Sequence, residues 1–124
     1  MNEPGAEARR PWLLSAFFCL AGINHFVMPG AYRAIVPPSL KSRASEAVAV
    51  SGVAELIGGL AVLPAATRRP AGLGLVALLA AVFPANLYMA REPERFASIP
   101  RWALYARLPL QLLMVRWVLR VTRR

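Results

Sequence analysis

The chain has 124 residues, the length of a single domain, and 57% of them are hydrophobic while only 17% are charged. Soluble domains average about 45–50% apolar and about 25% charged residues, so this composition argues against an ordinary soluble domain. The formal charge of +9 comes from basic residues clustered between long apolar runs, which is typical of membrane loops and helix ends and argues against a nucleic-acid partner.

The first ten residues, Met1–Arg10, are small, polar and charged, and we expect them to form a disordered tail. The apolar run Pro11–Met28 follows. It resembles a signal peptide in having arginines before it, but it lacks a convincing cleavage site, so we interpret it as the first membrane helix. The connection Gly30–Ser45 contains Pro37 and Pro38, which exclude a long helix, and it is the longest predicted loop.

The second helix is predicted over Glu46–Leu63 and is followed by Pro64 and a short basic turn, Thr67–Pro70. The third, Ala71–Ala90, carries no formal charge over a length that can cross a hydrocarbon core of ~30 Å. Its Pro84 should kink the helix and free the carbonyl of Ala80, which a nearby polar group would then satisfy.

A charged loop, Arg91–Arg101, leads to the fourth predicted helix, Trp102–Val121, and a basic tail follows at residues 122–124. The predicted fold is therefore all-α: a four-helix transmembrane bundle over residues 11–121, with short loops and one longer loop between the first two helices. Four crossings place both ends of the chain on one side, together with Arg68 and Arg69. The distribution of basic residues favours the cytoplasm for that side.

Seven polar residues lie within the apolar helices, and all fall in the membrane half opposite the termini when depth is counted at 1.5 Å per residue. Ser51 and Glu55 are four residues apart on one helix, as are Arg107 and Gln111 on another, so each pair shares a face. A charged group at this depth is costly and marks a candidate site. We predict one outward-opening ligand pocket formed by Asn24, His25, Ser51, Glu55, Asn86, Arg107 and Gln111.

Each of these residues also has a purely structural interpretation. Glu55 and Arg107 can neutralise each other as an ion pair, and Asn86 and Gln111 can hold helices together by hydrogen bonds. No His, Cys or Asp cluster supports His25 as a metal ligand. The single cysteine, Cys19, has no disulfide partner within the chain and reads as a small core residue. No catalytic residue and no metal site are predicted.

Several blocks of sequence resemble one known family. They are Gly22–Tyr32 with its His-Phe and Pro, Ile35–Pro38, Ser51–Glu55 with Gly59-Leu60, Thr67–Arg69, Val82–Met89 and Arg107–Gln111. In this order they resemble the DoxX-like family of small four-helix membrane proteins. The resemblance implies a bacterial inner-membrane protein of four helices. Its namesakes are associated with a thiosulfate:quinone oxidoreductase and with oxidative-stress complexes.

Three functions remain open from the sequence. The first is an accessory membrane subunit whose polar pocket binds a small ligand, a quinone or a lipid headgroup. The second is a membrane subunit of a quinone-linked oxidoreductase, in which Glu55 and His25 carry protons. The third is a small transporter that acts as an oligomer, which four helices without a repeat disfavour. The expected partners are the lipid bilayer and either redox proteins or further copies of the chain, with quinone as the one cofactor suggested.

Overall fold

The computed structural model describes residues 10–123, and over this range every regular element is a helix. The predicted all-α class is thereby confirmed for the described residues. The predicted tail, residues 1–10, lies outside them except for Arg10, which precedes the first helix. The elements are α1 (Pro11–Val27), α2 (Pro29–Ala34), η2 (Pro38–Arg43), α3 (Ala44–Ala61), α4 (Ala65–Arg91), η3 (Pro93–Phe96) and α5 (Arg101–Thr122).

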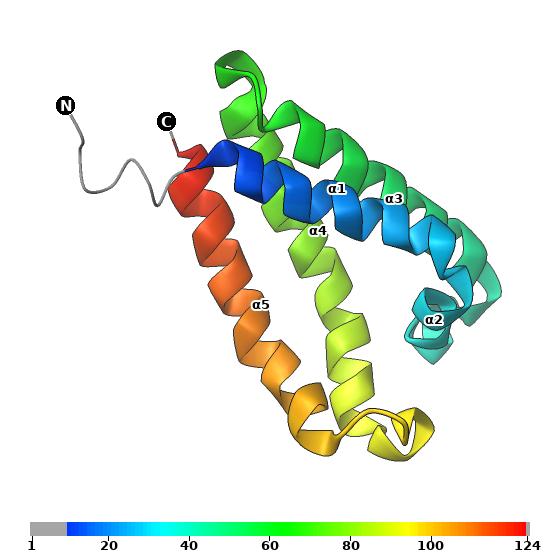
Figure 1. Ribbon diagram of the computed structural model, residues 1–124. Helices are drawn as coiled ribbons and strands as arrows, with labels where there is room; N and C mark the ends of the chain where they lie inside the picture. Colours follow the sequence, from blue (N-terminus) through cyan, green and yellow to red (C-terminus); the bar gives the residue numbers. More distant parts are fainter. Residues whose placement is uncertain (1–9, 124) are drawn as a thin grey trace.

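The four long helices form two pairs. Helix α1 packs along α3, and α4 packs along α5, while α3 and α4 provide the main contact between the pairs. Figure 1 shows that the pairs converge where α1 begins and α5 ends, and diverge toward the end that carries α2 and η3. The bundle therefore has a closed end and an open end, a difference that the sequence did not predict.

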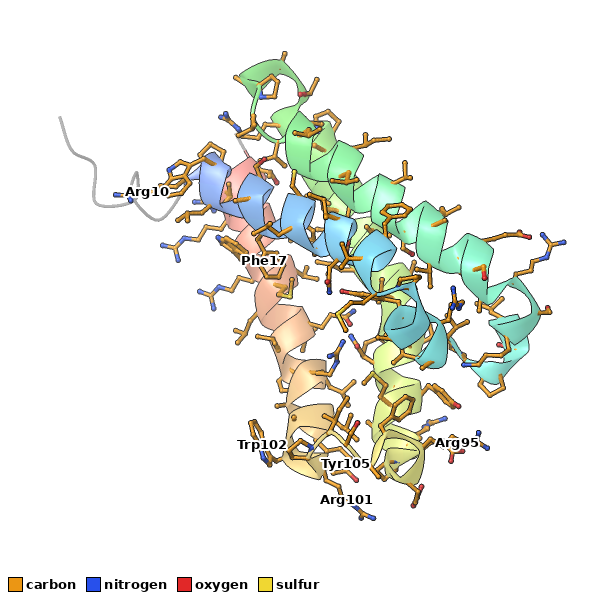
Figure 2. The ribbon with its side chains drawn as sticks, turned by 45° about the vertical axis from the view of Figure 1, so that its right-hand side comes forward. Arg10, Phe17, Arg95, Arg101, Trp102 and Tyr105 are labelled. Carbon is orange, nitrogen blue, oxygen red and sulfur yellow. The ribbon has the colours of Figure 1, made fainter. Side chains whose placement is uncertain are left out.

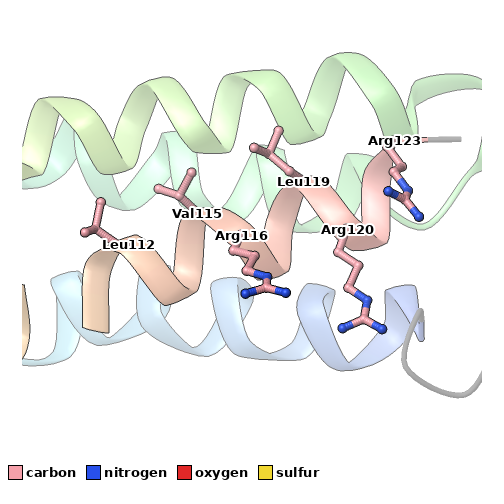
Figure 3. Close-up of a pocket in the computed structure, with 6 residues that line it drawn as sticks. All are labelled: Leu112, Val115, Arg116, Leu119, Arg120 and Arg123. Carbon is pink, nitrogen blue, oxygen red and sulfur yellow. The ribbon is translucent and has the colours of Figure 1, made fainter. Parts of the chain in front are cut away.

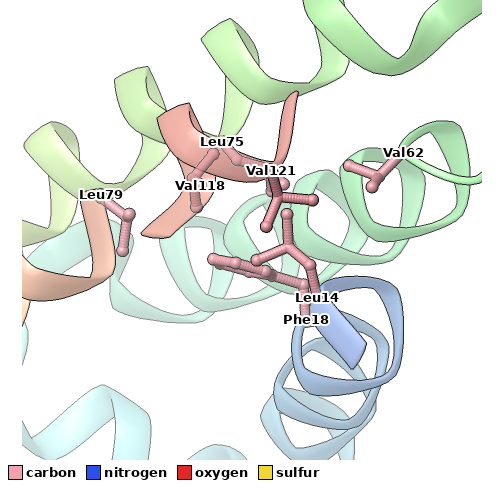
Figure 4. Close-up of a cluster of buried hydrophobic side chains, with 7 residues drawn as sticks. All are labelled: Leu14, Phe18, Val62, Leu75, Leu79, Val118 and Val121. Atoms are coloured by element: carbon pink, nitrogen blue, oxygen red, sulfur yellow. The ribbon is translucent and has the colours of Figure 1, made fainter. Parts of the chain in front are cut away.

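The closed end is filled by a single apolar core. Figure 4 shows its seven buried side chains, which come from α1, α4, α5 and the residue that follows α3: Leu14, Phe18, Val62, Leu75, Leu79, Val118 and Val121. At the open end the buried apolar residues form two separate clusters, one around Val48 of α3 and one around Leu104 of α5. The buried residues of each cluster belong to one pair and its adjoining segments, and Ile35, which follows α2, packs against the second cluster. A cavity remains between the pairs there.

Two glycines allow the close approach of helices. A Cβ atom on Gly72 of α4 would lie 2.5 Å from the Cβ of Thr122 at the end of α5. A Cβ on Gly22 of α1 would lie 2.7 Å from the carbonyl oxygen of Gly52 on α3. Real Cβ atoms do not approach other atoms so closely, so each pair of helices depends on a missing side chain.

Helix α4 begins at Ala65, six residues before the predicted start, and the predicted basic turn at Thr67–Pro70 is wrong. Residues 67–69 instead form the first turns of the helix. The Arg68 guanidinium donates from Nε to the carbonyl of Val62 at 2.8 Å and from Nη2 to that of Leu63 at 2.7 Å. These bonds satisfy carbonyls at the end of α3 that have no helical partner, which favours helix over turn.

The predicted long loop is the longest connection, but most of it is helical. Pro29 opens α2 and Pro38 opens η2, in the first position, where proline costs no hydrogen bond. The Lys41 ammonium donates to the carbonyls of Arg33, Ala34 and Val36 at 2.9, 3.0 and 3.2 Å. This lysine ties η2 to the end of α2, so the segment folds back as an ordered cover on α3.

The surface of the described residues is unusually apolar. Twenty-two large hydrophobic side chains are exposed, among them Leu20 at 67%, Val50 at 68% and Leu112 at 71%, against fourteen hydrophobic residues that are buried. Figure 2 shows Trp102 and Tyr105 projecting from the start of α5 beside Arg101. Ser15, His25, Asn86, Gln111 and Thr122 are buried instead. Such an outer surface needs an apolar environment to cover it.

Two helical segments of the described chain are long and apolar enough to cross a membrane. They are Pro38–Ala61, with 24 residues and a mean hydropathy of 1.3, and Ala65–Arg91, with 27 residues and a mean hydropathy of 1.9. Helix α1 is apolar but has 17 residues. Helix α5 is confirmed as a helix over Arg101–Thr122, but it is not among the two spans. Its four arginines, at positions 101, 107, 116 and 120, lower its hydropathy.

Candidate functional site

A cavity of about 320 Å³ lies between the two helix pairs, on the open side of the apolar core. All four long helices and the α2–η2 segment contribute to its wall, which is mostly aliphatic and aromatic. Five of the seven predicted site residues line it: His25, Ser51, Glu55, Asn86 and Arg107. The volume is within the range of small-molecule sites, and the apolar wall with few polar groups matches their usual composition.

One wall of the cavity carries a histidine and a carboxylate in contact. The Nδ1 atom of His25 on α1 lies 3.3 Å from Oε2 of Glu55 on α3. The same Nδ1 lies 2.8 Å from the carbonyl oxygen of Ala21, an acceptor, so Nδ1 carries a proton. The buried Oε2 has no hydrogen-bond partner in the described part of the chain. The Nδ1–H of His25 is therefore directed at Ala21 and not at Glu55, and the Glu55 carboxylate can still accept a hydrogen bond.

Tyr32 of α2 fixes the position of the histidine. Its ring stacks on the His25 ring with 3.9 Å between centroids and 22° between planes. Its hydroxyl accepts a hydrogen bond of 2.7 Å from Nδ2 of Asn24. Asn24 does not line the cavity, so this predicted site residue acts through Tyr32. On the other side, a Cβ on Gly52 would lie 2.9 Å from the Cβ of His25, so α3 can approach the histidine only because residue 52 is glycine.

The opposite wall is held by a hydrogen-bonded network between α4 and α5. Asn86 donates from Nδ2 to Oε1 of Gln111 at 2.6 Å, and Arg107 donates from Nε to Oδ1 of Asn86 at 3.2 Å. Gln111 in turn donates from Nε2 to the carbonyl of Leu79 at 2.7 Å. Gln111 is buried behind the cavity wall and does not line it.

The Leu79 carbonyl is one residue before the Ala80 carbonyl, which the sequence predicted to lack a helical hydrogen bond. Pro84 lies inside α4 and cannot donate to the carbonyl of Ala80, the residue after Leu79. Gln111 thus supplies a side-chain donor to α4 one residue before the predicted position. The interpretation of Asn86 and Gln111 as interhelical hydrogen-bonding residues agrees with this network.

The predicted ion pair between Glu55 and Arg107 is wrong for this structure. Glu55 has its ionic contact with His25, and Arg107 bonds Asn86 through Nε, so the acid and the arginine lie on different walls. The physical reason is the divergence of the helix pairs, which separates α3 from α5 at this level. Arg107 lines the cavity from α5, and the rest of its guanidinium has no bond within the described residues.

The comparison with known families gives one match. Residues 14–122 match the family described as a domain of unknown function, DUF8561. The chain belongs to the DUF8561 family. No curated protein and no solved structure matches it. The DUF8561 match covers α3, α4 and α5, all of α1 from Leu14 onward and every cavity residue, so the site belongs to the family domain and not to an added segment. The resemblance to the DoxX-like family stays a prediction.

Chemically, this arrangement combines an acceptor on one wall with a donor on the other. Glu55 can accept a hydrogen bond, Arg107 can donate one, and His25 with Glu55 can hold or transfer a single proton. No group of three metal-ligating side chains occurs in the described part of this DUF8561 chain. The site therefore favours binding of a small polar head inside an apolar cavity.

Sequence reasoning missed Tyr32 and the apolar lining. Tyr32 fell within the predicted loop Gly30–Ser45 and was not named as a site residue, yet α2 turns its ring onto His25. A signal for it was present, since Tyr32 closes the His-Phe block of the family resemblance. Phe18, Leu79 and Met114 read as ordinary core residues, and only the divergence of the helix pairs leaves them facing a cavity.

Proposed function

We propose that this chain is a multi-pass membrane protein whose cavity binds a small amphipathic ligand, as an accessory subunit of a larger membrane system. The observation that carries the proposal is the cavity itself, which is apolar around its wall and has Glu55 and Arg107 on opposite sides. A flat ring with polar oxygens, such as a quinone head, and the polar end of a lipid both match this pattern.

The placement in a membrane rests on the distribution of side chains. Exposed hydrophobic residues lie along the outside of all four long helices, while the polar side chains of His25, Asn86 and Gln111 are buried. We infer that α1, α3, α4 and α5 each cross the bilayer, with the shorter α1 and the arginine-containing α5 crossing as parts of the bundle. In this proposal the open end faces away from the cytoplasm of a bacterial inner membrane, and both ends of the chain face the cytoplasm.

A second function is favoured by one contact. The 3.3 Å approach of His25 to Glu55 provides a pair of groups that can exchange a proton beside a bound quinone. In this alternative the protein is a membrane subunit of a quinone-linked oxidoreductase, and it requires a partner that supplies electrons. Reduction of a bound quinone by an added donor would favour this function over simple binding.

The proposal is tested with a short-chain benzoquinone as the probe. Trp117 packs on Phe17, whose ring lines the cavity, so quinone binding should quench tryptophan fluorescence of the purified protein. Arg107→Gln removes a charged donor and should weaken binding about tenfold, since such hydrogen bonds contribute ~1.5–3 kcal/mol. Arg101→Gln is the matched control, because it removes the same charge from α5 outside the cavity. Equal binding by both variants, or no saturable quenching, would contradict the proposal.

A further inference from the structure

A second pocket lies on an exposed face of α5, a different face from the one that lines the cavity. It is an open groove of about 600 Å³ lined by five α5 residues and the residue that follows the helix: Leu112, Val115, Arg116, Leu119, Arg120 and Arg123. Figure 3 shows the three arginine side chains extending to one edge of this face, and the leucines and the valine to the other. The groove is therefore amphipathic, with cations along one edge and an apolar strip along the other.

In the described part of the chain, none of the three arginines has a hydrogen bond or an ion pair with another residue. The acidic side chains described there lie elsewhere, since Glu46 contacts Arg43 and Glu92 contacts Arg95. Three exposed guanidinium groups within two helical turns repel each other, and an anionic occupant would relieve this repulsion.

The order of residues along the helix defines the shape of the occupant. Leu112 and Val115 are nearest the middle of the bundle, and Arg123 directly follows the last residue of α5. Seven residues separate Arg116 from Arg123, or ~10 Å of helix. Arginines at a helix end extend toward the membrane surface, while leucines one to three turns deeper contact acyl chains. The occupant thus needs an anionic head and a long apolar body.

We propose that the α5 groove binds an anionic phospholipid, with Arg116, Arg120 and Arg123 around the headgroup phosphate and an acyl chain along Leu112, Val115 and Leu119. The site rests on the membrane location of the proposed function but not on the ligand of the cavity. It assigns a role to the basic end of α5, where the sequence analysis described only a basic tail.

The test compares retention of phosphatidylglycerol and phosphatidylcholine by the full chain in native mass spectrometry after extraction from mixed nanodiscs. The wild type should retain phosphatidylglycerol preferentially. In the triple variant Arg116→Gln, Arg120→Gln, Arg123→Gln, the ratio of retained phosphatidylglycerol to phosphatidylcholine should fall by about fivefold for each arginine removed. The control is the triple variant Arg33→Gln, Arg91→Gln, Arg101→Gln, which changes the charge equally at the other end of the bundle and should keep the preference.

Three further measurements complete the test. Replacement of the same three groove arginines by lysine keeps the charges and should retain most of the preference. Inorganic phosphate should not displace the lipid, because it lacks the acyl chain that the leucines contact. Equal loss in the groove variant and the control variant, or displacement by phosphate, would overturn the site. Failure of the wild type to enter neutral nanodiscs would instead overturn the membrane location.

Discussion

The contact between Gly72 and Thr122 allows a sharp test of how closely α4 and α5 pack. A Cβ on Gly72 would lie 2.5 Å from the Thr122 Cβ and 2.9 Å from its Cγ2. No rotation about χ1 moves a Cβ atom, so Gly72→Ala must push the two helices apart. Overpacking of this kind costs about 1–3 kcal/mol, against a gain of about 0.5–1 kcal/mol from the better helix propensity of alanine.

The matched control is Gly74→Ala, two residues further along the same helix. A Cβ there meets no atom within 4 Å, so only the propensity gain of about 0.5–1 kcal/mol remains. The free energies of unfolding of the two variants should therefore differ by ~1–3 kcal/mol, the overpacking cost alone. Thermal unfolding in detergent followed by circular dichroism measures this difference. The reasoning fails if Gly72→Ala is as stable as Gly74→Ala.

A compensating change identifies the contact itself. Thr122→Gly removes the side-chain atoms that a Cβ on Gly72 would meet, and Thr122 is the last residue of α5, where glycine disturbs little of the helix. Combined with Gly72→Ala it should recover a large part of the lost stability. Equal losses from Gly72→Ala in the two backgrounds would contradict the contact.

Two further predictions concern the network and the topology. Asn86→Leu and Gln111→Leu should each destabilise the protein, because each leaves a buried amide without its partner, and the double variant should lose less than the sum, with a coupling of about 0.5–2 kcal/mol. Additive losses would contradict a stabilising hydrogen bond between Asn86 and Gln111. With Cys19 replaced by Ser, a cysteine at Ala66 should resist an impermeant maleimide in intact cells and one at Ser98 should react. Labelling at Ala66 and not at Ser98 would contradict the proposed orientation.

Sequence patterns predicted the helices well where apolar runs are long. Helix α3 was expected over Glu46–Leu63 and occurs at Ala44–Ala61, because an uninterrupted apolar run permits few other structures. The predicted start of α4 was wrong because Thr67–Pro70 was interpreted as a basic turn, whereas Pro70 lies inside the helix. The local cost of this proline is offset by Arg68, which bonds the carbonyls at the end of α3, and such a contact between two elements has no sequence signature.

Five of the seven predicted site residues line one cavity, but which of them touch was not predicted. Depth counting grouped residues that share a level in the bundle, and His25, Glu55, Asn86 and Arg107 lie around the same cavity. Which of them touch depends on how the helices pack within and between the pairs. The close approach of Gly22 to Gly52 brings α1 and α3 together, where Glu55 contacts His25, while Arg107 lies on the other pair.

The ligand content of the protein purified gently from native membranes tests the central claim most directly. Ala85→Phe fills the cavity from α4, and Ala77→Phe places the same ring on an exposed position of α4 outside it. Mass spectrometry of extracts should find one small amphipathic molecule at a fixed ratio to the wild type and to Ala77→Phe, and much less of it with Ala85→Phe. Equal amounts in all three proteins would contradict the claim that this cavity is a binding site.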